Sequence, residues 1–210
     1  SISVLRDADE LDISARAIGA LTVGGTLSGS DFDLVGGAGI TVAMGAIKIG
    51  QGTEVGFFAG GLRIASITAG SLFDTTIFAG SVGAISVAGS SALGRRGDAE
   101  MTITTSDTTR ATTLDKLTVK GLIGGSIQLV GNCGPVSLGG IREDWVMLVG
   151  TTGLTPADVR DDGTPFTSTG LFAPSGGVIA SLKIARPALN AGFDVANRNI
   201  EPFAVIAQTI

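Results

Sequence analysis

The chain has 210 residues, enough for one sizeable domain, and 44% of them are hydrophobic. It contains no histidine and one cysteine, Cys133, which excludes Ser-His-Asp and Cys-His catalysis, histidine-ligated metals and an internal disulfide. The formal charge of −5 leaves no basic footprint for nucleic acid, and no apolar run reaches the roughly 18 residues of a membrane span.

A six-residue pattern repeats along the chain: apolar, two variable residues, apolar, a small or polar residue, apolar. Clear copies start at Ile18, Met44, Ile64, Val82, Leu114, Cys133, Ile179 and Ile200, and weaker ones at Ala8 and Asp98. From 44 to 133 the successive starts differ by 20, 18, 16, 16 and 19. The gap of 26 from 18 to 44 predicts one unit with a bulged loop. The gap of 46 from 133 to 179 predicts two units plus an insertion.

A repeat unit of 16 to 21 residues is too short for two helices and suits short strands joined by glycine-rich corners. The last three positions of the pattern alternate in, out, in. We therefore expect parallel strands with an inner ladder formed by Leu21, Ile47, Ile67, Ile85, Leu117, Val136 and Leu182. The outer face is expected to carry Thr22, Lys48, Thr68, Ser86, Thr118, Ser137 and Lys183.

A second motif, Leu or Phe followed by Val or Ala and then Gly, closes many units. It starts at Leu34, Phe58, Phe78, Leu129 and Leu148, each at a nearly constant interval after the central apolar residue of the pattern. This spacing predicts that the tripeptide occupies a fixed place in each unit. Cys133, at an apolar position of the pattern, is expected to be a small buried residue rather than a reactive thiol.

Two segments interrupt the repeat. The range 101–113 is rich in threonine, which favours strand edges and turns. The range 151–177 contains three of the six prolines and predicts a long surface loop, a usual location for function. Its carboxylates Asp158, Asp161 and Asp162 are candidate calcium ligands, although a plain solvated loop is the favoured interpretation.

The acidic residues allow two other interpretations. The N-terminal acids Asp7, Asp9, Glu10 and Asp12 form a second candidate calcium cluster. A polysaccharide lyase with Arg160 as its base is the enzymatic alternative. Adjacent residues such as Asp161 and Asp162 point apart on a strand, so they do not form the carboxylate pair of a hydrolase. No catalytic residue and no cofactor is therefore assigned.

Two stretches of the repeat, 18–30 and 80–90, resemble the repeats of very large exported bacterial β-solenoid proteins of the planctomycete and adhesin-like type. The range 190–199 is similar to a loop between their coils. The resemblance implies export and a surface or extracellular structural role. It carries over no catalytic residue.

Together these observations predict an all-β, right-handed parallel β-helix of roughly eight to ten coils. It is expected to form a single domain over 1–210, with an insertion at about 151–177. The expected function is a non-catalytic structural or adhesive scaffold, secreted or at the cell surface. Its expected partners are copies of itself or further repeats end to end, or surface glycans. The alternative is a β-helix that binds or cleaves carbohydrate through the 151–177 insertion.

Overall fold

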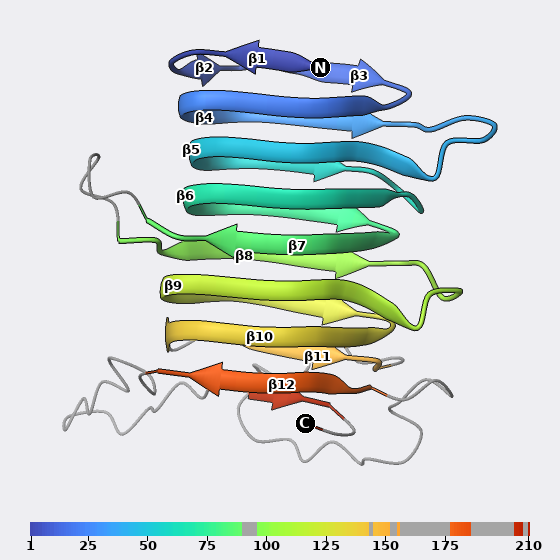
Figure 1. Ribbon diagram of the computed structural model, residues 1–210, viewed down its shortest axis with the longest axis vertical. Coiled ribbons are helices and arrows are strands. Elements are labelled where there is room, and N and C mark those ends of the chain that lie inside the picture. The colour runs from blue at the N-terminus through green and yellow to red at the C-terminus, as the bar shows by residue number, and fades with distance from the viewer. Residues whose placement is uncertain (90–95, 143–144, 152–154, 156–176, 186–203, 208–209) are drawn as a thin grey trace.

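The computed structural model describes residues 1–89, 96–142, 145–151, 155, 177–185, 204–207 and 210. Strands dominate these residues, and no helix occurs among them, so the chain is all-β as the sequence predicts. The strands stack in layers along the long axis of the molecule (Figure 1). In chain order they are β1 (Ile2–Val4), β2 (Ala8–Asp9), β3 (Ile13–Ala15), β4 (Ile18–Leu34), β5 (Val42–Phe58), β6 (Arg63–Ala79), β7 (Ser81–Val87), β8 (Ala99–Thr105), β9 (Thr112–Leu129), β10 (Asn132–Ile141), β11 (Val146–Val149), β12 (Ile179–Ile184) and β13 (Ala204–Ile206).

Each layer has two arms. The first arm contains the six-residue pattern, and in Figure 1 the long strands β4, β5, β6 and β9 then turn back to form a second arm behind it. The first arms are ordered β1-β4-β5-β6-β7-β9-β10-β12, and every strand pair in the described residues is parallel.

The inner ladder of the first arms is confirmed. Leu21 pairs with Ile47, Ile47 with Ile67, and Ile67 with Ile85. The column continues through Leu117, Val136 and Leu182. All of these side chains except the half-buried Leu182 are inaccessible to solvent or nearly so. The predicted outer column from Thr22 to Lys183 runs beside it in the same register, exposed or half-buried.

A second inner column, which the sequence pattern did not reveal, fills the other side of the core. It consists of the second-arm residues Ile13, Phe32, Phe57, Ile77, Ile103, Ile127, Met147 and Val205, paired in that order. Phe32 and Phe57 stack with ring centroids 5.3 Å apart. The two columns belong to one continuous cluster of apolar residues, so no layer buries its apolar side chains without its neighbours.

Glycine forms the corner between the two arms of β4. Gly24 and Gly25 together oppose the single residue Gly50 of β5, because the register shifts between Val23 and Thr26. A Cβ on Gly24 would overlap the backbone carbonyl oxygen of Leu5 in the layer before it. A side chain is therefore excluded where the backbones of consecutive layers approach most closely.

Three of the predicted copies of the pattern are second arms rather than new units. Ala8 pairs with Leu27, Met101 with Thr75, and Val205 with Met147, all on second arms. The layer that begins at Val82 is followed directly by the one that begins at Leu114. The predicted steps from 82 to 98 and from 98 to 114 are thus parts of one layer. The pattern predicts two units there because a second arm has the same in-out alternation as a first arm.

The prediction of two units between 133 and 179 is also wrong. Cys133 pairs directly with Ile179, so this span is a single layer whose second arm includes β11. The threonine-rich range 101–113 is likewise not a full interruption, since Met101–Thr105 completes β8 and the turn follows it. The gap of 26 between the starts at 18 and 44 is one layer with a loop at 35–41, as predicted.

The tripeptide closes units, as predicted, and the strands that it ends are second arms, but its residues do not share one register. Leu34 and Leu129 point into the core, whereas Phe58 and Phe78 lie on the outside in a column with Asp33. The nearly constant spacing in sequence thus includes a shift of one residue in register, which reverses the face on which a strand side chain lies.

Candidate binding surfaces

The predicted calcium ligands Asp158, Asp161 and Asp162 lie outside the described residues, as does Arg160. Of the insertion at 151–177, the structure describes Thr151, Thr155 and Gly177. The predictions of a calcium site, a lyase site or a carbohydrate site in this insertion therefore remain predictions.

The N-terminal acids are described, and they bind the next layer of their own chain. Asp7 Oδ1 accepts the backbone N–H of Thr26 at 2.6 Å, and Asp12 Oδ1 accepts that of Asp31 at 3.0 Å. Asp9 accepts the hydroxyl of Ser28. Within the described part of the chain no three acidic or cysteine side chains gather closely enough to share a metal ion. These carboxylates thus serve as acceptors at the corners, and the second calcium candidate is not supported.

The N-terminal layer presents an open strand edge. Among the described residues, β1, β2 and β3 each pair with β4 and with no other strand. Ile2, Val4 and Ile13 pack against the core yet stay half-buried, and the neighbouring Leu5 is 91% exposed. Unpaired backbone groups beside apolar side chains are the features to which another strand can add.

A shallow pocket of about 290 Å³ opens on the second arms of β6, β8 and β9. Thr76, Thr102 and Ser126 line it as one outward column across three consecutive layers. Asp74 and Glu100 lie at its acidic end. The register shift between Leu72 and Thr75 sets Phe73 and Asp74 opposite Glu100 alone, which brings these two carboxylates to the same end of the pocket.

The charges in this pocket are unequally paired. Arg142 Nη1 lies 2.8 Å from Glu100 Oε2, and the arginine side chain crosses above Gly124, where a Cβ would touch it. Asp74 has no such cation among the described residues. Its backbone has a φ of 46°, in a column with Glu54 at 54° and Gly29 at 51°. The left-handed conformation is uncommon for residues other than glycine, and with Glu10 at 51°, opposite Gly29, it is retained in four successive layers.

Two aromatic side chains lie beside the pocket on the same face. Phe58 pairs with Phe78, and Phe78 follows the pocket residue Thr76 by two positions on its strand. Phe78 is 39% exposed, and the Phe58 ring lies over Gly56, next to the carboxylate of Asp31. The exposed ring of Phe78 and the hydroxyls and carboxylates of the pocket therefore lie on one face.

Cys133 is buried at its place in the pattern, as predicted. Burial raises the pKa of its thiol from the ordinary 9.0 to about 12. We expect folded protein to resist an aromatic disulfide reagent at about pH 8, and unfolded protein to react fully, as followed by absorbance.

The same pKa predicts a pH dependence of stability. Below pH 9.0 the buried neutral thiol makes its full contribution to the free energy of unfolding. This contribution is lost as the pH rises toward about 12, because the thiol of the unfolded chain ionises first. Wild type is therefore expected to lose more stability above pH 9.0 than Cys133→Ala does. Equal losses in the two proteins, or rapid labelling of the folded chain, would show that the thiol is accessible.

Sequence reasoning missed the second-arm face because its members are far apart in the chain. The interval from Glu54 to Asp74 equals that from Phe58 to Phe78, and this equal spacing was the available signal.

No helix of the described residues is long and apolar enough to cross a membrane. Comparison with family models, curated proteins and solved structures finds no match to this chain.

Proposed function

We propose that this chain is a segment of a right-handed parallel β-helix that acts as a non-catalytic structural or adhesive scaffold outside the cell. In this proposal the layers are coils, and the segment stacks or continues end to end with further coils or with copies of itself. A secreted or cell-surface location is part of the proposal.

The observation that carries the proposal is the open edge of β1, β2 and β3. All three strands meet β4 with the same offset in residue number: Ile2 on Leu21, Ala8 on Leu27 and Ile13 on Phe32. The N-terminal layer therefore keeps one register along its three strands, with half-buried aliphatic residues and backbone groups available on its free side. A further coil placed on that side would continue both inner columns.

Assembly tests this proposal. Wild type is expected to form elongated particles with increasing concentration, seen by electron microscopy and by sedimentation. The double variant Val4→Lys/Ile13→Lys, which places charges among the half-buried residues of the edge, is expected to sediment as the 20.9 kDa chain. The matched variant Ser3→Lys/Ser14→Lys adds equal charge at the exposed neighbours and should assemble like wild type.

A wild-type chain that stays at 20.9 kDa at every concentration would contradict the proposal. Equal assembly of the two double variants would show that any association uses another surface. Circular dichroism of each variant establishes that the remaining layers are folded.

A further inference from the structure

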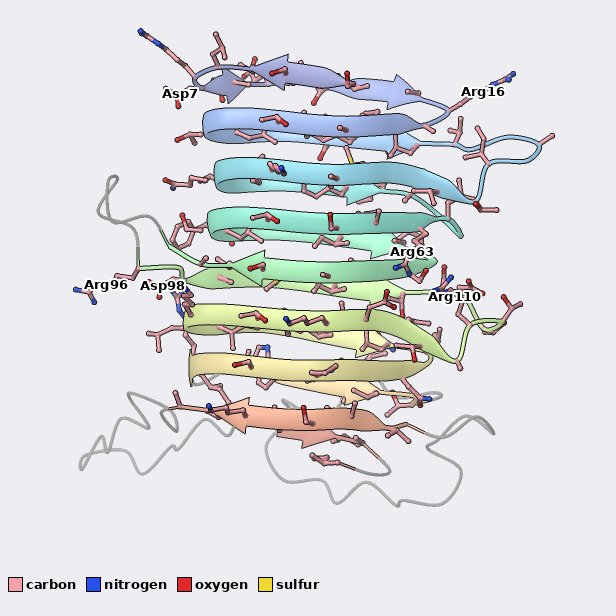
Figure 2. All side chains as sticks on the ribbon, viewed as in Figure 1. Asp7, Arg16, Arg63, Arg96, Asp98 and Arg110 are labelled. Atoms are coloured by element: carbon pink, nitrogen blue, oxygen red, sulfur yellow. The ribbon has the colours of Figure 1, made fainter. Side chains whose placement is uncertain are left out.

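The outer face of the second arms has a one-sided charge distribution. From β4 to β11 its strands contribute five acidic residues, and Arg142, which follows β10, reaches this face and pairs with one of them, Glu100, so an acidic excess remains; the acids are Asp31, Asp33, Glu54, Asp74 and Glu100. The lysines Lys48, Lys116 and Lys183 lie on first arms. Arg16, Arg63 and Arg110 lie toward the same edge of the layers, with Arg16 nearer the N-terminal end (Figure 2). The face therefore complements a positively charged partner.

The pocket on this face contains a polar group that the protein itself leaves unused. Ser126 is 8% exposed, lines the pocket, and its hydroxyl makes no hydrogen bond with the described residues. The hydroxyl itself is open to the pocket, because it is not one of the fully buried side-chain atoms that lack a partner. Its position beside Thr102 and below Thr76 leaves it available to a donor that enters the pocket.

From these features we propose that the second-arm face binds an extended basic segment of another polypeptide, with one arginine side chain entering the pocket. The guanidinium pairs with Asp74, the carboxylate that lacks a cation among the described residues, and donates to Ser126. A second cationic side chain lies over the exposed ring of Phe78. The acidic excess favours this partner over a neutral glycan, which gains nothing from the uncompensated charge.

Peptide binding tests the proposal. A fluorescein-labelled peptide of alternating arginine and serine is titrated with the protein, and its anisotropy is followed. Asp74→Asn is expected to raise the Kd about tenfold, since it removes one charge-assisted contact. Asparagine tolerates the left-handed backbone at this position, so the variant is expected to fold. Ser126→Ala is expected to raise the Kd about threefold.

Asp115→Asn is the matched control, because it removes the same charge from an exposed position on a first arm, away from the second-arm face. It is expected to change the Kd by less than about twofold. Equal weakening by Asp115→Asn and Asp74→Asn, or absence of binding, would overturn the proposal. So would tighter binding of an uncharged oligosaccharide, measured by competition, because the face would then select sugars.

Discussion

Replacing Ile67 by alanine is expected to lower the free energy of unfolding by about 4 kcal/mol. Ile67 is fully buried at the middle of the first-arm ladder, between Ile47 in one layer and Ile85 in the next. Both neighbours are fixed by their own strand pairing, so they cannot move far into the space that the truncation leaves. Urea titration followed by circular dichroism measures the change.

Thr68→Ala is the control for this variant, because Thr68 is the next residue on the same strand and lies exposed in the outer column. It is expected to change the free energy of unfolding by less than about 0.5 kcal/mol. Comparable losses at Ile67 and Thr68 would show that the strand does not have one buried and one exposed face.

Gly45→Ala is expected to lower the free energy of unfolding by about 3 kcal/mol, although it adds only a methyl group. The Cβ at this position would lie closer than 3.0 Å to the backbone carbonyl oxygen of Gly19 in the preceding layer. Because that oxygen belongs to the backbone of a paired strand, the overlap can be relieved only by separating the two layers. Thermal and urea unfolding measure the loss.

Gly19→Ala is the matched control. Gly19 has the same place in the six-residue pattern, and a Cβ there would meet nothing within 4 Å. The substitution is expected to be neutral or to stabilise by about 0.5 kcal/mol, because alanine restricts the unfolded chain. If the two alanines have the same effect, consecutive layers do not approach each other as described.

The first arms could be predicted from the sequence because their pattern keeps the inward positions aligned in every layer. Leu21 and Ile47 are aligned by the pattern even though a seven-residue loop, 35–41, separates their strands. The second arms could not be assigned in the same way. Their alternation resembles that of first arms, so the sequence predicts a separate unit around Met101. The strand pairing instead places Met101 opposite Thr75, on a second arm.

The second-arm face could not be predicted because two irregularities create it. The register shift after Leu72 brings Asp74 and Glu100 to one end of the pocket, and the spacing between these two acids matches no regular unit. The one-residue shift between Leu34 and Phe58 turns the aromatic rings outward. Both depend on the way neighbouring layers pair, which local sequence does not specify.

Disulfide formation between outward positions tests the central claim, that consecutive layers pair in parallel and in register. In a Cys133→Ala background, Thr22→Cys/Lys48→Cys joins residues paired on adjacent layers, about 4.8 Å apart and within the range of a disulfide. Thr22→Cys/Thr68→Cys spans two layers, beyond that range. Under mild oxidation the first pair is expected to close within the monomer and the second to stay reduced. Closure of the second pair, or failure of the first, would contradict the account.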